Sequence, residues 1–192
     1  EVAPMNSIQV FENGEFGKIR AMRGDMTKGA EMETVVHPLK PIADENSRIL
    51  ILGTMPSPKS REAAFYYAHP QNRFWPAMAA VLGEGLPEKN KDRAEMLRRH
   101  GIALWDVLKC CRIDGASDAS IKDAEANDIA GLLRQCPKIE RIFTTGAAAN
   151  RLYRQLLFPQ THIEAIALPS PSSANARMRL SDLIEAYRAI LG

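Results

Sequence analysis

Residues 49–60 read ILILGTMPSPKS, a run of four aliphatic residues followed by a polar loop with two prolines. Such an uninterrupted apolar run is typical of a strand buried on both faces of a parallel sheet. The loop comes close to the phosphate-binding pattern G-x-x-x-x-G-K-[ST], but Pro58 stands where the second glycine should be. The stretch therefore predicts a buried strand that ends in a loop, and it leaves open what the loop does.

Pro56 and Pro58 argue against binding of a nucleotide triphosphate at this loop. A phosphate-binding loop uses successive backbone N–H groups and glycine's freedom to curl, whereas each proline removes an N–H and fixes φ near about −65°. A stiff loop at the carboxyl end of a parallel strand is still where open α/β folds place their ligands. The alternative is an ordinary connection in which the prolines only end the strand.

The composition limits the classes of protein that the chain can form. Its 192 residues are 45% hydrophobic, which suits one well-packed domain, and it has no apolar run of about 18 residues for a membrane span. A net charge of +2 permits a local basic face without indicating a polyanionic partner. The three cysteines and four histidines show neither a disulfide framework nor metal-ligand spacing. We expect a cytoplasmic protein without a metal or other cofactor.

Strand and helix patterns alternate from about residue 47 onward. Apolar runs that predict buried parallel strands occupy residues 49–52, 102–108, 141–146 and 163–169. Helical spacing of apolar residues follows in residues 129–136 and 180–187, and Gly101 after two arginines and a histidine is typical of a helix end. This alternation predicts a three-layer α/β/α sandwich around a mostly parallel sheet of about four strands. Residues 1–34 lack it and are predicted to be an appended segment, so that residues 35–192 form the domain.

A second notable stretch, residues 66–76, reads YYAHPQNRFWP. Phe74 and Trp75 are expected to anchor the following helix in the core, and Arg73 to pair with a carboxylate. A loop amide beside tyrosines is also what a site for a flat, hydrogen-bonding heterocycle requires. Asn72 therefore has two interpretations, a ligand in such a site and a cap for the helix that begins near Arg73.

A third stretch, residues 168–178, reads LPSPSSANARM and follows the last predicted strand. Its small hydroxyl-bearing residues could approach a backbone or a groove without steric cost. As an ordinary loop it would place Asn175 at the start of a helix. In both interpretations, residues 168–178 begin at the same carboxyl edge of the sheet as the loop of residues 53–60.

In their order along the chain, GTMPSPKS, FYYAHPQNRFW, LWDVLKCCRIDGASDASI and SPSSANA resemble the uracil-DNA glycosylase superfamily, most closely its hypoxanthine-DNA (DNA-deoxyinosine) glycosylase branch. The resemblance runs from about Val35 to the C-terminus. It implies an α/β/α fold and a monofunctional DNA N-glycosylase that removes a deaminated base flipped out of DNA. Mismatch-specific uracil glycosylases are also similar, and on their motif the catalytic asparagine falls on Met55.

The site residues follow from this resemblance. A thioether cannot orient water as an amide does, so Met55 departs from the motif, and the hypoxanthine branch implies Asn72 as the catalytic residue instead. Asp106, Arg112 and Asp118 lie in a segment that also resembles the family, but we assign them no role. The implied base pocket consists of Gly53, Thr54, Met55, Pro56 and Tyr67, with Tyr67 stacking on the base. The implied DNA contacts are Ser60, Ser170, Pro171, Ser172, Ser173, Asn175 and Arg177.

The expected partner is double-stranded DNA that contains a deaminated base, bound by a monomer in the prokaryotic cytoplasm and so associated with the nucleoid. The base is expected to be hypoxanthine, with uracil as the alternative, because both present a carbonyl beside a ring N–H. Two other classes remain open. One is a DNA-binding module of the same fold without catalysis, and the other is a nucleotide or small-metabolite binding domain.

Overall fold

The computed structural model describes residues 32–192 of the chain. Its centre is a four-stranded parallel sheet in the order β3-β2-β6-β7. The strands are β2 (Ile49–Gly53), β3 (Ile102–Asp106), β6 (Arg141–Thr145) and β7 (Ala165–Leu168). Each of the four predicted strands is present, although the run at residues 102–108 ends its parallel pairing at Asp106. Of the appended segment predicted for residues 1–34, residues 1–31 lie outside the described residues.

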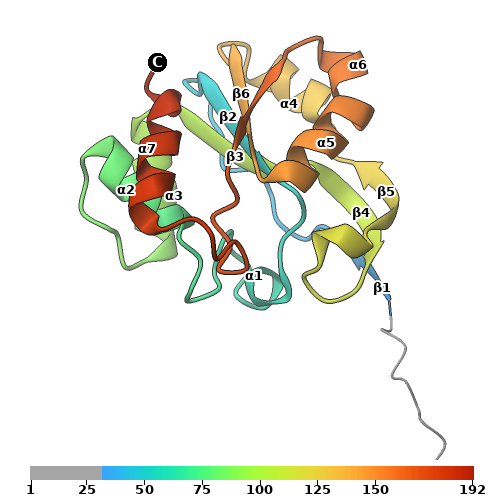
Figure 1. Ribbon diagram of the computed structural model, residues 1–192. Helices are drawn as coiled ribbons and strands as arrows, with labels where there is room; N and C mark the ends of the chain where they lie inside the picture. The colour runs from blue at the N-terminus through green and yellow to red at the C-terminus, as the bar shows by residue number, and fades with distance from the viewer. Residues whose placement is uncertain (1–31) are drawn as a thin grey trace, which may run out of the picture.

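Helices cover both faces of this sheet, as Figure 1 shows. One face packs against α2 (Phe74–Leu82), α3 (Asn90–Arg99) and α7 (Leu180–Tyr187). The other packs against α4 (Ile129–Gln135) and α5 (Ala147–Leu156), and α6 (Phe158–Thr161) follows α5. Along β2 the side chains alternate, so Ile51 lies in the first core and Leu50 and Leu52 in the second. The predicted α/β/α sandwich is confirmed.

A second sheet was not predicted from the sequence. It is antiparallel, in the order β1-β4-β5, and consists of β1 (Glu33–Val36), β4 (Leu108–Ile113) and β5 (Lys122–Ala126). The chain turns from β3 into β4 within two residues, because the N–H groups of Val107 and Leu108 donate to the carbonyls of Gly53 and Thr54, at 2.8 and 3.1 Å. This sheet adds Val35, Cys111 and Ile113 to the second core.

Local signals set the ends of several elements. Gly101, the second residue beyond α3, has a φ of 65°, which is the left-handed conformation that glycine favours. Asp128 caps α4 by accepting the N–H of Gly131 at 2.7 Å. Short helical turns complete the chain at α1 (Pro58–Glu62), η1 (Asp118–Ser120) and η2 (Arg188–Ile190). Within residues 32–192, every helix is too short or too polar to cross a bilayer.

Candidate active site

A pocket of about 140 Å³ opens at the carboxyl edge of the parallel sheet, where β2, β3 and β6 end. The three loops singled out in the sequence meet there. Its lining residues are Gly53, Thr54, Met55, Pro56, Ser57, Ser60, Tyr66, Tyr67, Asn72, Asp106, Ile113, Gly115, Ala116, Asp118, Thr145, Ser170, Pro171 and Ser172.

The end of β2 forms one wall of the pocket, and Gly53 is required there. A Cβ on Gly53 would collide with Oδ1 of Asp106 and lie 3.0 Å from the hydroxyl of Tyr67. Thr54 is buried and donates its hydroxyl to Oδ2 of Asp118 at 2.9 Å, which joins this wall to η1. Met55 is half-buried in the lining and brings no hydrogen-bonding group to the pocket.

Tyr67 stands on the side of the pocket that faces α2. Its ring stacks on Phe74, with centroids 4.0 Å apart and planes 18° apart, and its hydroxyl bonds to Thr145 Oγ1 at 2.9 Å. The backbone of Tyr67 is left-handed, with a φ of 51°, which is unusual for a bulky residue and shows that the surrounding contacts hold it there. Burial raises the pKa of the Tyr67 phenol well above its ordinary value, with the Asp106 carboxyl as the next cause.

Asn72 lines the pocket and lies two residues before the start of α2. Its Oδ1 accepts the N–H of Phe74, the first residue of α2, at 2.9 Å, so Asn72 satisfies one N–H at the helix start through an Asx turn, although Arg73 and not Asn72 holds the N-cap position. A backbone N–H can only donate, which identifies the atom it meets as the oxygen of the amide. The Nδ2 group is therefore the donor, and it has no hydrogen-bond partner among the described residues.

Arg73 connects the second loop to the third. Its guanidinium donates to the carbonyls of Pro171 (3.3 Å) and Asn175 (3.1 Å), and also to those of Ser172 and Met178. The expectation that Arg73 pairs with a carboxylate is wrong, because the carbonyls of the loop at residues 171–178 take up its donors. Phe74 and Trp75 are buried in the first core, as predicted.

The loop after β7 contributes Ser170, Pro171 and Ser172 to the pocket. Ser173 and Arg177 are exposed on the same loop outside the lining. Asn175 is also outside the lining and donates Nδ2 to the carbonyl of Ser170 at 3.0 Å, so it braces the loop. Arg179, and not Asn175, precedes α7.

Ser60 lines the pocket from α1, but its hydroxyl has partners within the protein. It lies 3.1 Å from the hydroxyl of Ser57 and accepts the N–H of Ala68 at 3.3 Å. Ser60 is buried, whereas the neighbouring Lys59 is exposed and pairs with Glu62 at 2.7 Å. These contacts indicate that Ser60 holds the Tyr67 loop against α1.

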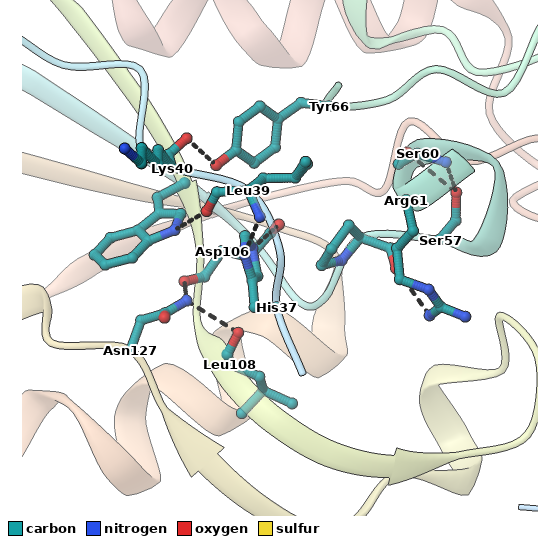
Figure 2. A network of polar contacts seen from close by, with 12 residues as sticks. His37, Leu39, Lys40, Ser57, Ser60, Arg61, Tyr66, Asp106, Leu108 and Asn127 are labelled. Atoms are coloured by element: carbon teal, nitrogen blue, oxygen red, sulfur yellow. Dashed lines mark hydrogen bonds and ion pairs between the residues drawn. The ribbon is translucent and has the colours of Figure 1, made fainter. Parts of the chain in front are cut away.

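Asp106 and Asp118 bring two carboxyl groups to the pocket, and the sequence assigned neither a role. Asp106 ends β3 beside Gly53 and is only 4% exposed; its Oδ2 lies 2.8 Å from Nε2 of His37 (Figure 2). Burial raises the pKa of Asp118 above its ordinary value, while the hydroxyl of Thr54 opposes the shift. The sequence feature that could have identified Asp106 was its position at the carboxyl end of a predicted parallel strand. No sequence feature pointed to His37. Arg112 lies on β4 away from the pocket and pairs with Asp123 at 3.6 Å.

A larger hollow of about 760 Å³ lies between α5 and β7, next to the same edge of the sheet. It contains Arg151 and Arg154 of α5, and none of the residues predicted for the site line it. In the described part of the chain, no three His, Cys, Asp or Glu side chains gather as they would around a metal ion.

The model of the family described as the Uracil DNA glycosylase superfamily matches residues 40–191. This chain belongs to the Uracil DNA glycosylase superfamily. The match includes the three loops that meet at the pocket, so the resemblance read from the sequence motifs is confirmed at the level of the superfamily.

Known relatives match most of the chain. A protein of Methanosarcina barkeri named Hypoxanthine DNA glycosylase is 36% identical over 152 residues, which are 77% of this chain and 95% of the relative. A protein of the same name from Methanosarcina acetivorans is 38% identical over 71% of this chain and 85% of its own length. A candidate uracil DNA glycosylase from M. acetivorans, solved by NMR, matches with a TM-score of 0.70 and 32% identity over 83% of this chain and all of that chain.

Proposed function

We propose that this protein is a monofunctional DNA glycosylase that releases hypoxanthine from deoxyinosine in double-stranded DNA, acting as a monomer and without a cofactor. The observation that carries the proposal is the meeting of three superfamily motifs at one pocket, in a chain whose two curated relatives are named Hypoxanthine DNA glycosylase. A pocket at the carboxyl edge of a parallel sheet is also the expected ligand position for this architecture.

The reaction requires the target nucleotide to leave the duplex. A base inside the helix cannot reach a pocket of this kind, so it must be extruded, and a poorly paired deaminated base costs less to extrude than a normal one. In the chemical step the C1′–N9 bond breaks and its electron pair leaves with the purine. A water oxygen then bonds to C1′, and a proton from that water ends on the base.

Asn72 is the side chain that we assign to this step. Because its oxygen is held by the N–H of Phe74, its Nδ2 donor remains available on the pocket side. A donor fixed before the reaction can stabilise the negative charge that develops on the leaving purine without having to reorient. Loss of one such donor typically costs about two to three orders of magnitude in rate.

Tyr67 is assigned to hold the base by stacking. Phe74 covers one face of its ring, and the hydroxyl is held by Thr145, so the ring is fixed in orientation beside the pocket. Stacking of a base on an aromatic side chain contributes about 1 to 3 kcal/mol. Gly53, Thr54, Met55 and Pro56 complete the base pocket as its wall.

The loop at residues 170–177 is assigned to the DNA on either side of the flipped nucleotide. Ser170, Pro171 and Ser172 reach the pocket, while Ser173 and Arg177 are exposed beyond it. Small polar side chains and one arginine suit phosphate contacts, which provide affinity and not base choice. Ser60 and Asn175 serve this surface by bracing the loops.

Uracil is the second candidate base. The superfamily description and the designation of the NMR structure both name uracil, and uracil shares with hypoxanthine a ring N–H beside a carbonyl. A distinction between the two bases requires a direct measurement of release from each.

The test is base release from end-labelled duplexes that carry one deoxyinosine or one deoxyuridine opposite each normal base, followed by alkaline cleavage of the abasic site. We expect cleavage at deoxyinosine. Release of uracil alone would assign the protein to the uracil glycosylases and contradict the hypoxanthine assignment. Binding to DNA with no release of either base would favour the non-catalytic module and contradict the proposal.

A further inference from the structure

Two carboxyl groups line the pocket, and their hydrogen-bond partners differ. Asp106, at the end of β3, is 4% exposed, and its Oδ2 lies 2.8 Å from Nε2 of His37 (Figure 2). Nδ1 of His37 accepts the backbone N–H of Leu39 at 3.1 Å, so the ring proton is on Nε2 and points at the carboxyl group. A donor directed at a carboxyl oxygen favours its ionised form, so Asp106 brings a negative charge to the pocket.

Asp118, the first residue of η1, has a hydroxyl as its partner. Thr54 donates to its Oδ2 at 2.9 Å, and its Oδ1 has no hydrogen-bond partner among the described residues. In that part of the chain no side-chain oxygen or nitrogen that is sealed from solvent lacks a partner, so Oδ1 is accessible, and Asp118 lines the pocket. When the group is protonated, the oxygen that accepts from Thr54 is its carbonyl oxygen, so the proton lies on Oδ1.

The surroundings of Asp118 favour the protonated form. Burial raises the pKa of its carboxyl group, the hydroxyl of Thr54 lowers it, the negative charge of Asp106 on β3 raises it, and Arg151 on α5 lowers it. The thiol of Cys111 on β4 also interacts with Asp118, but burial raises the pKa of this thiol to about 11, so it stays uncharged. A bound duplex adds negative phosphates and displaces water, and both effects raise the pKa of Asp118 further.

Breaking the C1′–N9 bond is easier when the purine receives a proton, because it then leaves as a neutral molecule. Asn72 can donate a hydrogen bond to the base, but an amide keeps its proton. Burial raises the pKa values of the phenols of Tyr66 and Tyr67, so they also keep theirs. Since Asp106 is ionised, Asp118 is the group that can give a proton among the described residues of the lining.

We propose that Asp118 is the general acid of the reaction and that its Oδ1 gives a proton to a ring nitrogen of the purine as the C1′–N9 bond breaks. The electron pair of that bond leaves with the base, which departs neutral. The Asp118 carboxylate then takes a proton from the water whose oxygen bonds to C1′, which restores the acid. Two carboxyl groups in one site, one ionised and one protonated, are a common division of roles in catalysis. This proposal rests on the proposed function and adds the source of the proton.

The test is the rate of hypoxanthine release in a single turnover, measured from about pH 5 to about pH 9 at an excess of protein over DNA. It compares wild type with Asp118→Asn, which keeps an acceptor for Thr54 and has no proton to give. The control is Asp123→Asn, whose carboxyl group is exposed on β5 and pairs with Arg112 at 3.6 Å. Binding is measured separately on a duplex with 2′-fluorinated deoxyinosine, because the fluorine disfavours the cationic sugar of the transition state and keeps the bond intact.

Release by wild type and by Asp123→Asn should slow as the pH rises past the raised pKa of Asp118. Asp118→Asn should be about 100-fold slower at low pH and should not show this decline, because a positioned acid contributes at least about that factor. Its affinity for the fluorinated duplex should stay within about 3-fold of wild type, since a neutral amide resembles the protonated carboxyl group. If Asp118 in its ionised form activated water, the rate would rise with pH instead. A merely structural role would leave the shape of the pH profile unchanged.

Thr54→Val provides a second test that keeps Asp118 in place. It removes the hydroxyl that lowers the pKa of Asp118, so the decline in rate should move to higher pH. A change that only loosened the pocket wall would lower the rate at every pH without moving the decline.

The proposal is overturned if Asp118→Asn is folded and keeps the wild-type pH profile, or if Thr54→Val leaves the decline at the wild-type pH. It is also overturned if the wild-type rate does not fall as the pH rises. In each of these cases wild type still releases hypoxanthine, so the proposed function stands and the assignment of Asp118 alone fails. If wild type releases no hypoxanthine at any pH, both fail.

Discussion

At the scale of single residues, Asn72 has two separable tasks. Its oxygen caps α2 through Phe74, and its Nδ2 is free on the pocket side. Asn72→Asp keeps an acceptor for the Phe74 N–H and removes the donor. We expect unchanged thermal stability and a loss of about 100- to 1,000-fold in single-turnover release of hypoxanthine.

Asn72→Ala provides the matched comparison, because it removes the cap as well. It should lose activity and also about 1 kcal/mol of stability. If Asn72→Asp released hypoxanthine as fast as wild type, the capping interpretation would be sufficient and the catalytic assignment would be wrong.

Gly53 allows Asp106 and Tyr67 to approach β2 at the pocket wall. In Gly53→Ala the new methyl group would collide with Asp106 Oδ1 and crowd the Tyr67 hydroxyl, so base release should fall at least about 10-fold. Gly85→Ala is the control, since nothing lies within 4 Å of its Cβ position. If both variants released the base as fast as wild type, the pocket wall would be able to shift without loss of activity.

Asp118 should make stability depend on pH. Burial raises its pKa in the folded protein, so ionising it costs stability as the pH rises from its ordinary pKa through the raised value. Asp118→Asn can still accept from Thr54 and carries no charge. Its melting temperature relative to wild type should therefore increase from about pH 4 to about pH 7. If the difference in melting temperature between Asp118→Asn and wild type stayed constant over this pH range, the raised pKa of Asp118 would be wrong.

The sequence predicted much of the pocket, and the part it missed has a physical reason. Loop residues such as Asn72 and Ser170 stand in motifs, so a resemblance could identify them. The pairing of His37 with Asp106 joins residues 69 positions apart and depends on where β1 and β3 place them. No local pattern encodes that contact. The predicted partner of Arg73 was wrong because its actual partners are backbone carbonyls. Every residue has a carbonyl, so no sequence pattern identifies which ones a side chain will meet.

At the scale of elements, Arg73 joins α2 to the loop before α7. Arg73→Lys keeps the charge but cannot reach four carbonyls with a planar fork of donors. We expect a loss of about 2 kcal/mol in the free energy of unfolding and faster hydrogen exchange in residues 170–178. Base release should fall with it, because the loop lines the pocket.

Arg188→Lys is the control for this substitution, since Arg188 is exposed and, among the residues that the structure describes, its side chain pairs only with Glu185, at 3.4 Å. If Arg73→Lys matched this control in stability and in exchange, the carbonyl contacts of Arg73 would not hold the loop.

The parallel strands were predictable and the antiparallel sheet was not. β2, β3 and β6 are almost fully buried, so their sequences are apolar runs. β5 reads KDAEA and is mostly exposed, a composition that strands usually avoid. It forms because β4 pairs with it across the sheet, a tertiary effect that the local sequence does not show.

At the scale of the whole molecule, two hydrophobic cores support the carboxyl edge of the parallel sheet, where the pocket opens. The first core joins α2, α3 and α7 to the parallel sheet, and the second joins α4, α5 and the antiparallel sheet to its other face. The pocket receives residues from β2, β3, β4 and β6 and from the loop after β7, so both cores must be intact to form it.

The predicted division of the chain gives a further test. A chain of residues 32–192 contains every element that builds the pocket, and residues 40–191 match the superfamily. We expect it to melt within about 3 °C of the full chain and to release base at the same rate. A large loss of either would contradict the interpretation of residues 1–31 as part of an appended segment.

The most direct measurement of the central claim is release of free hypoxanthine from a duplex with a single deoxyinosine, at an excess of protein over DNA. The account predicts that one hypoxanthine appears for each abasic site, without added metal or cofactor. It also predicts that Asn72→Asp binds the duplex but releases the base about 100- to 1,000-fold more slowly. A wild-type protein that binds this duplex and leaves the glycosidic bond intact would contradict the account.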